Sequence, residues 1–268
     1  MELRTHDDLA KYSPQEVEAF VNSLSPLTEL KAFLKARNEP EVDLAYQRTQ
    51  IARATRRAQD TPKLRETFRI EPSSIDGCSR KLWYQLQGAP KKDYVDDRLR
   101  LIFDTGHAIH EQLQSYFEAM WGWIDHPSLA DDTTDSFTDE ASVVIEDRFI
   151  SGSTDGVRIT PVYRYALEIK SINHDGFGKL TKPLPGHPKQ FHCYMKGLDV
   201  PFGYILYYDK NNSSMQEFAV PFSTPLWDSI QVKTDIVLEA DEDGPDPDVK
   251  RWACKQCNYK AICEKRMG

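Results

Sequence analysis

The sequence lacks several features that mark common classes of protein. It has no long apolar run and no recognisable signal peptide, so we expect a cytoplasmic protein with no membrane partner, in the host cytoplasm if virally encoded. Only five cysteines are present, and in a reducing compartment a disulfide framework is not expected. No G-x-x-x-x-G-K-S/T loop and no internal repeat occur, which excludes an intrinsic ATP-driven motor of the P-loop type and a repeat architecture.

A net charge of −8 by itself argues against a nucleic-acid partner, but the charges are segregated along the chain. Phosphate contacts need a local positive potential rather than a positive total. Acids form two runs, the second in a linker marked by prolines: Asp131, Asp132, Asp135, Asp139 and Glu140, then Glu239, Asp241, Glu242, Asp243, Asp246 and Asp248. Bases gather elsewhere, as a positive helix face or as ordinary solvated residues: Arg48, Arg53, Arg56, Arg57, Lys63 and Arg65, then Lys179, Lys182 and Lys189.

A β-hairpin is predicted in the middle of the chain. Residues 149–159 and 165–172 are rich in β-branched and aromatic residues, and a short segment with a proline separates them. Side chains two apart share a face of a strand, so Glu168 and Lys170 project together while Leu167 and Ile169 face a core. Antiparallel pairing can bring Asp155 beside Glu168. Two carboxylates and an ammonium group are then expected to converge.

This trio suits the cleavage of a phosphodiester. The attacking oxygen, the leaving oxygen and the phosphoryl group all carry negative charge during the reaction. Magnesium or manganese held by Asp155 and Glu168 would offset that charge and lower the pKa of a bound water. Lys170 could stabilise the attacking hydroxide or the phosphate. The carbonyl of Ile169 is a further candidate ligand.

The order D-x(n)-E-x-K resembles that of the PD-(D/E)XK nuclease superfamily. A stretch with helical apolar spacing, residues 99–120, contains Gly106 and His110, which match the G-x-x-x-H element of the RecB-like branch. The resemblance implies that His110 is an imidazole ligand of the same magnesium or manganese ion. His107 is a competing candidate for that role.

A second helix, residues 188–197, is predicted from Pro188 in its first turn and Gly197 at its end. Gln190 and Tyr194 are i, i+4 neighbours on one face of it. They match the Q-x-x-x-Y motif of RecB-like nucleases. That resemblance implies that the pair contacts the backbone of a nucleic acid and supports the active site.

Four cysteines form a candidate metal-ligand set: Cys78, Cys254, Cys257 and Cys263. One cysteine before the hairpin and three after it resemble the iron–sulfur arrangement of AddB-type helicase–nucleases and CRISPR-associated RecB-like exonucleases, which implies a 4Fe–4S cluster. Zinc is the alternative, although a zinc ribbon usually has two tight C-x-x-C pairs. Either metal would fasten the C-terminal end to the region of Cys78. Cys193 is interpreted as a buried apolar residue.

The expected fold class is α/β, with a central mixed sheet flanked by helices and a helical N-terminal extension. We divide the chain into that extension, residues 1–66, and a RecB-like nuclease domain, residues 67–268. The extension begins with a capping box, Ser13-Pro14-Gln15-Glu16, and continues with helices at 27–36 and 41–58. Further elements are expected as helices at 73–87 and 225–238 and strands at 141–146, 202–208 and 215–220.

The sequence therefore predicts a metal-dependent DNA nuclease, most simply an exonuclease acting on single-stranded ends in recombination or repair. Any motor activity would come from a helicase or recombinase partner. Two other classes stay open. One is a non-catalytic DNA-binding or assembly subunit of a recombination or CRISPR adaptation complex, which would not require Asp155, Glu168 and Lys170 together. The other is a zinc-stabilised interaction module, which leaves the hairpin unexplained.

Overall fold

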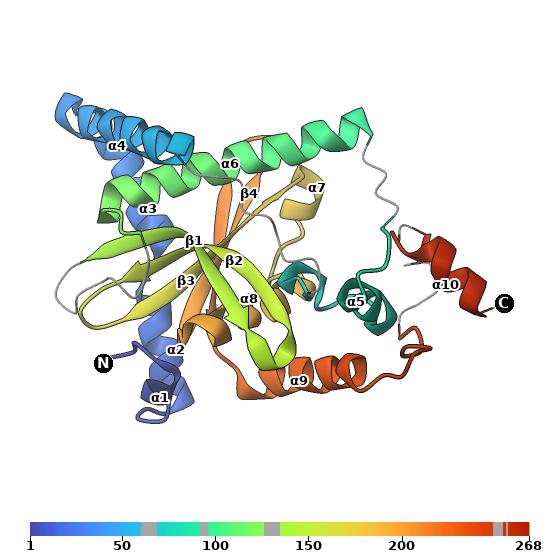
Figure 1. The fold of residues 1–268 in the computed structure, drawn as a ribbon. Helices are drawn as coiled ribbons and strands as arrows, with labels where there is room; N and C mark the ends of the chain where they lie inside the picture. The colour runs from blue at the N-terminus through green and yellow to red at the C-terminus, as the bar shows by residue number, and fades with distance from the viewer. Residues whose placement is uncertain (60–68, 92–95, 126–134, 249–253, 256, 268) are drawn as a thin grey trace.

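A five-stranded mixed sheet forms the centre of the protein (Figure 1). The computed structural model describes residues 1–59, 69–91, 96–125, 135–248, 254–255 and 257–267. The strands lie side by side in chain order, and only β3 and β4 are parallel. Their bounds are β1 Ser136–Ile145, β2 Ile150–Ile159, β3 Arg164–Ile172, β4 Phe202–Asp209 and β5 Met215–Pro221.

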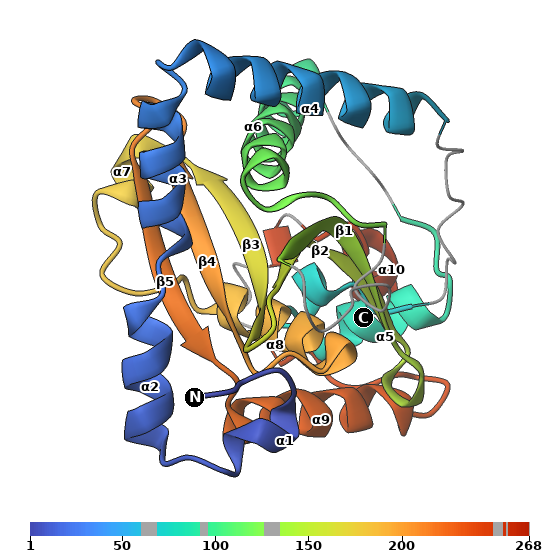
Figure 2. The ribbon, with the colours of Figure 1, turned by 90° about the vertical axis from the view of Figure 1, so that its left-hand side faces the viewer.

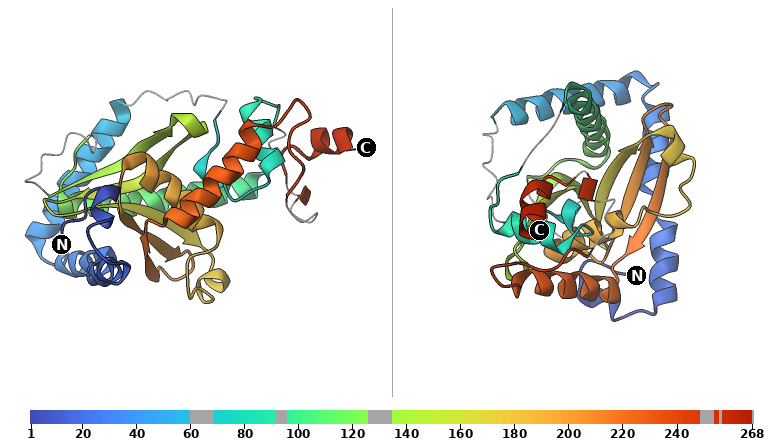
Figure 3. Two further views of the ribbon diagram at one scale, coloured as in Figure 1. Left: turned by 90° about the horizontal axis from the view of Figure 1, so that it is seen from below. Right: turned by 90° about the vertical axis from the view of Figure 1, so that its right-hand side faces the viewer.

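Helices cover both faces of this sheet, as Figures 2 and 3 show from three sides. One core joins the sheet to α5, α8, α9 and the C-terminal segment, and the other joins it to the N-terminal helices and α6. The first layer comprises α5 Ser79–Leu86, α8 Gly186–Leu198, α9 Thr224–Leu238 and α10 Lys260–Met267. The second comprises α2 Pro14–Ser23, α3 Pro26–Ala36 and α6 Asp97–Trp121, and α4 Pro40–Gln59 packs on α6 from outside (Figure 1). The predicted α/β class is confirmed.

Short elements complete the chain, and none changes the layering. They are α1 His6–Leu9, the 3₁₀ turns η1 Pro72–Ser74 and η3 Glu146–Arg148, and α7 His174–Phe177. The helices predicted at the N-terminus are present, and the Ser13–Glu16 capping box forms as expected. Within the described residues, no helix combines the length and apolarity needed to cross a bilayer. The domain boundary at residue 66 stays a prediction.

Helix α6 lies across the sheet and positions part of the candidate site (Figure 1). Its first turn is capped by Asp96, whose Oδ1 accepts from the backbone N–H of Leu99 at 2.7 Å. Its buried stripe, Leu113, Phe117 and Trp121, repeats every four residues and packs on the sheet. This packing places His110, about one turn before Leu113, over the ends of the strands.

Two sequence predictions about helices are wrong. The helix expected over 73–87 is divided, because Gly77 makes a tight turn in which an added Cβ would lie 2.9 Å from the Ser74 carbonyl oxygen. Gly197 does not end α8, which continues to Leu198, and Asp199 adopts the left-handed conformation with φ of 52°. Gly197 instead permits close packing, because an added Cβ would approach Val143 to 2.3 Å.

Of the four α4 arginines considered as a positive face, Arg48 is exposed and the other three pair with acidic residues. Arg53 is buried, and it pairs with Glu118 and Asp139 at 3.0 and 2.6 Å. Arg56 pairs with Glu118, and Arg57 pairs with Glu111 and Asp139. Arg53 is therefore turned toward α6 and β1, whereas the side chains of Arg56 and Arg57 are paired but remain 28% and 37% exposed. Lys63 and Arg65, together with Asp131 and Asp132 of the acidic run, lie outside the described residues.

Candidate active site

The site forms where the ladder between β2 and β3 ends. The last registered pair is Gly156 with Leu167, so Asp155 and Glu168 are the next residues across the hairpin. Beyond the Gly156–Leu167 pair, the N–H of Ile169 donates to a side chain instead of to a backbone carbonyl of β2. Its acceptor is Asp155 Oδ2, at 2.6 Å. The N–H and C=O of one strand residue point to the same side, so the Ile169 carbonyl also faces Asp155.

The second half of the site is a hydrogen-bonded cluster beneath Glu168. Lys170 Nζ lies 2.6 Å from Glu168 Oε1 and donates to Gln190 Oε1 at 2.9 Å. Gln190 donates through Nε2 to Glu168 at 2.8 Å and to the Tyr194 hydroxyl at 3.0 Å. Both α8 residues are buried, with exposures of 8% and 5%. They hold Glu168 and Lys170 in place, which fits the supporting part of their predicted role, whereas contact with a nucleic acid stays a prediction.

His110 approaches the same spot from α6. Its Nδ1 lies 2.9 Å from Asp155 Oδ1, and its side chain is 27% exposed. Gly106, one turn earlier, faces the end of β3, since an added Cβ would lie 3.5 Å from the Ser171 hydroxyl. The competing His107 is exposed, and the contacts described for the site do not include it. The geometry therefore favours His110 as the imidazole of this site.

The charges of the site influence one another. Burial raises the pKa of Glu168 to about 7, and the Asp155 charge adds to that rise while Lys170 opposes it. Burial lowers the pKa of His110, but the hydrogen bond and charge of Asp155 outweigh that effect and leave this pKa above its ordinary value. A carboxylate this costly to ionise is one that a neighbouring cation would stabilise.

The donor set is suited to a hard divalent cation. Asp155, Glu168 and the Ile169 carbonyl offer oxygen, and His110 offers an imidazole nitrogen, a combination that magnesium and manganese accept. In the described residues, no three His, Cys, Asp or Glu side chains are already spaced to hold an ion. The carboxylates are instead engaged by Lys170, His110 and the Ile169 N–H.

Two residues near Asp155 were not among the candidates from the sequence. Gln114 is fully buried, and its Nε2 donates to the Asp155 carbonyl oxygen at 2.9 Å and to Glu140 at 3.1 Å. Glu140, read in the sequence as part of an acidic run, also accepts from the Ser153 hydroxyl at 3.1 Å. The one available signal was the i, i+4 spacing of Gln114 from His110 on α6.

The four predicted cysteine ligands share one neighbourhood at the other end of the molecule. Cys78 is the N-cap residue of α5, Cys254 and Cys257 form a turn, and Cys263 lies in α10. Burial raises the pKa of the Cys263 thiol, Arg80 opposes the rise, and the three other cysteines increase it. The thiols therefore lie in one region, but within the described residues no three of them are spaced to hold a metal ion. Cys193 is buried in the core, as predicted.

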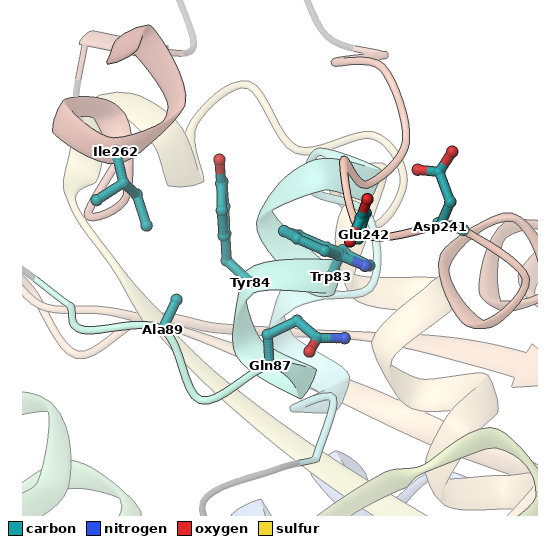
Figure 4. A pocket seen from close by; sticks show the side chains of 8 residues that line it. Trp83, Tyr84, Gln87, Ala89, Asp241, Glu242 and Ile262 are labelled. Atoms are coloured by element: carbon teal, nitrogen blue, oxygen red, sulfur yellow. The ribbon is translucent and has the colours of Figure 1, made fainter. Parts of the chain in front are cut away.

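The two chain segments that carry these cysteines pack through aromatic rings. Tyr84 of α5 stacks on Tyr259, with ring centroids 5.4 Å apart. A pocket of about 540 Å³ opens beside this contact, between Trp83, Tyr84 and Ile262 (Figure 4). Asp241 and Glu242 also line it. The carboxylate site is not part of this pocket.

No protein-family model matches the chain, and no curated protein matches it. Among solved structures, SSO0001 aligns over 86% of this chain and 99% of its own, with 14% identity and a TM-score of 0.46. The alkaline exonuclease LHK-Exo from Laribacter hongkongensis, alone or in complex with dAMP, aligns over 75% of this chain and 96% of its own, also with 14% identity and a TM-score of 0.46.

Proposed function

We propose that this protein is a divalent-metal-dependent deoxyribonuclease. The observation that carries the proposal is the convergence of Asp155, Glu168, Lys170 and His110 where the β2–β3 ladder ends. Two acids, an ammonium group and an imidazole from three segments meet in two adjoining hydrogen-bonded groups, which Ile169 joins through its backbone N–H. A purely structural role would not require this combination, because burying Glu168 costs free energy.

The residues would divide the work in a simple way. Asp155, Glu168, His110 and the Ile169 carbonyl would hold magnesium or manganese, which offsets the negative charge that develops on the phosphodiester. The ammonium group of Lys170 lies beside Glu168, and its hydrogen bond to Gln190 fixes its orientation. Exposure rises from 4% for the Glu168 side chain to 27% for that of His110, so DNA would approach from the α6 side.

The finer assignments rest on the sequence motifs. We propose that the substrate is a single-stranded DNA end, cut as an exonuclease, with a helicase or recombinase as partner. Gln190 and Tyr194 would support the site and position the strand. We also propose that Cys78, Cys254, Cys257 and Cys263 hold a 4Fe–4S cluster, with zinc as the alternative. The neighbourhood of the four thiols supports this assignment.

Digestion of end-labelled DNA tests the activity. Single-stranded, double-stranded, circular and end-blocked substrates are incubated with manganese, with magnesium or with chelator, so that activity, polarity and mode of cleavage are read together. We expect cleavage with metal and none with chelator. The Glu168→Gln variant should be inactive yet folded, because the pKa of Glu168 near 7 means that its neutral form is already accessible.

The matched control is Glu239→Gln, which makes the same chemical change on an exposed residue beyond the end of α9. It should cut DNA at the wild-type rate. Binding of DNA without cleavage, by wild type and Glu168→Gln alike, would support a non-catalytic DNA-binding subunit and overturn the nuclease.

A further inference from the structure

The N-terminal helix α4 reaches the candidate site through a single buried side chain. Arg53 is 5% exposed although it lies in the middle of α4, far in sequence from the hairpin. Its Nη2 donates to Gln114 Oε1 at 2.8 Å. Gln114 in turn donates to the carbonyl oxygen of Asp155 at 2.9 Å. Two hydrogen bonds therefore connect α4 to the backbone of a proposed metal ligand.

The orientation of the Gln114 amide is fully determined. Its NH₂ group has two hydrogens, and these meet two acceptors, the Asp155 carbonyl and Glu140 Oε1. Its carbonyl oxygen meets a guanidinium donor of Arg53. A reversed amide would place oxygen against two acceptors and NH₂ against a cation. Because Gln114 is fully buried, water cannot satisfy that arrangement.

Arg53 is itself fixed on every side. Its Nη1 contacts Glu118 at 3.0 Å and Asp139 at 2.6 Å, and its Nε contacts Glu111 at 3.4 Å. Glu118 and Asp139 belong to α6 and β1, the elements that flank Asp155. Nη2 contacts Glu111 at 3.5 Å and Gln114 at 2.8 Å, so the planar guanidinium joins α4 to α6 and β1.

Glu140 completes the arrangement on the neighbouring strand. The β1–β2 register passes from Asp139 with Gly156 to Ala141 with Thr154, so Glu140 lies opposite Asp155. Its φ of 50° takes it out of regular strand geometry, and both its carboxylate oxygens accept hydrogen bonds, from Gln114 and Ser153. The Asp155 backbone is thus held from the β1 side as well as from α6.

We propose that Gln114 is a positioning residue for Asp155 and that Arg53 makes helix α4 a working part of the metal site. This inference rests on the proposed function for its consequence, since the benefit of a fixed Asp155 is tighter binding of a divalent cation. Residues behind metal ligands typically change metal affinity by about 10- to 100-fold when they are altered. The N-terminal helices would then do more than cover the sheet.

The test uses the near-isosteric substitution Gln114→Glu, which sets a carboxylate against the Asp155 carbonyl and Glu140. Hydrogen–deuterium exchange of the metal-free protein should show faster exchange in segment 151–157, by about fivefold or more for the loss of one buried hydrogen bond. Calorimetric titration with Mn²⁺ alone should show affinity reduced by about tenfold or more.

Two variants separate positioning from a general loss of structure. Gln112→Glu makes the same change two residues away on α6, where the one hydrogen bond described for the Gln112 side chain goes to the Tyr116 hydroxyl. It should leave both readouts unchanged. Adding Glu140→Gln to Gln114→Glu removes one of the opposed acceptors and should restore part of the Mn²⁺ affinity. Should Gln114→Glu not fold, Arg53→Lys carries the same two readouts, because lysine lacks the forked donors.

The outcomes are distinct. Unchanged exchange in segment 151–157 in both Gln114→Glu and Arg53→Lys would overturn the positioning role. Faster exchange with unchanged Mn²⁺ affinity would overturn the claim that α4 serves the metal site. Wild-type protein that neither binds Mn²⁺ nor cuts DNA would refute the proposed function, whereas the exchange result would still decide whether Gln114 holds Asp155.

Discussion

The carboxylate site and the cysteine region both gather side chains from distant segments, but they are held differently. Around Asp155 and Glu168, polar atoms meet partners at hydrogen-bonding distance from α6, α8 and the strands. Around the cysteines, hydrogen bonds of Ser79 with Asp248 and of Arg80 with the Pro245 carbonyl join the start of α5 to the segment after α9. The segment that carries Cys257 and Cys263 is described as held by the stack of Tyr259 on Tyr84 and by apolar packing. The first geometry is fixed by the protein itself. The second is expected to depend on its ligand.

The largest expected effect comes from removing the cation of the carboxylate site. Lys170→Met keeps the length of the side chain and loses its charge, so we expect the rate of DNA cleavage to fall by roughly 10²- to 10³-fold or more. The thermal midpoint should change little, since Glu168 can remain neutral beside methionine. Lys31→Met, at an exposed position of α3, is the control. Near wild-type cleavage by Lys170→Met would show that the network is structural.

The next effect concerns the cysteine region. Cys257→Ser should abolish the bound metal, seen as lost iron and brown absorbance, or lost zinc if zinc is the native ion. Limited proteolysis after Leu238 should accelerate by about tenfold, because the C-terminal segment loses its attachment. Cleavage of DNA should fall less than in Lys170→Met.

Cys193→Ala is the matched control for loss of a thiol. Cys193 is buried in the core between α8 and the sheet, so its replacement should cost some stability and retain all bound metal. Equal metal content and equal proteolysis in Cys257→Ser and wild type would remove the contrast between the two regions.

A smaller effect tests the scaffold that both regions share. His192 is buried and neutral, since its Nδ1 lies 2.7 Å from the Pro188 carbonyl oxygen and its Nε2 accepts from the Ser223 N–H at 3.0 Å. Burial lowers the pKa of His192 to about 4. The unfolded chain therefore binds the extra proton first as pH falls, and stability decreases from about pH 6.5 toward 4 by up to roughly 3 kcal/mol.

Chemical denaturation at several pH values measures this dependence. His192→Gln should flatten the decline between pH 6.5 and 4, because the titrating group is gone. His107→Gln, on the exposed side of α6, should retain the wild-type profile. A decline that is identical in both variants would mean that other groups cause it.

The smallest effect is expected at Gly106. An added Cβ would make an ordinary contact of 3.5 Å with the Ser171 hydroxyl, and alanine favours a helix over glycine by about 1 kcal/mol. Gly106→Ala should therefore raise the free energy of unfolding by up to about 1 kcal/mol, measured by urea denaturation. A loss of stability would mean that the Cβ of the alanine lies closer to Ser171 than the expected 3.5 Å.

The fold was largely predictable because its signals are local. The alternation in 165–172 fixed which residues face each core, and Leu167 and Ile169 are buried as expected. The proximity of Asp155 to Glu168 followed from hairpin pairing. Gly197 and the 73–87 helix were misread because close packing on Val143 and the turn at Gly77 depend on tertiary contacts.

The surroundings of the site could not be predicted in the same way. Arg53 and Gln114 are joined only when α4 packs on α6, and nothing local in α4 distinguishes an inward arginine from a solvated one. The same limit explains why the pairing of Arg53, Arg56 and Arg57 with acidic residues was not expected. The buried partners of Arg53 are spread over α6 and β1, so that the pairing is a property of the fold.

The most direct test of the central claim is anomalous diffraction from crystals of the full chain grown with Mn²⁺. The account predicts an anomalous peak in contact with the Asp155 and Glu168 carboxylates and the His110 imidazole, lost in crystals of Asp155→Asn. Manganese bound elsewhere, with Glu168 still paired to Lys170 and Asp155 to His110, would contradict it.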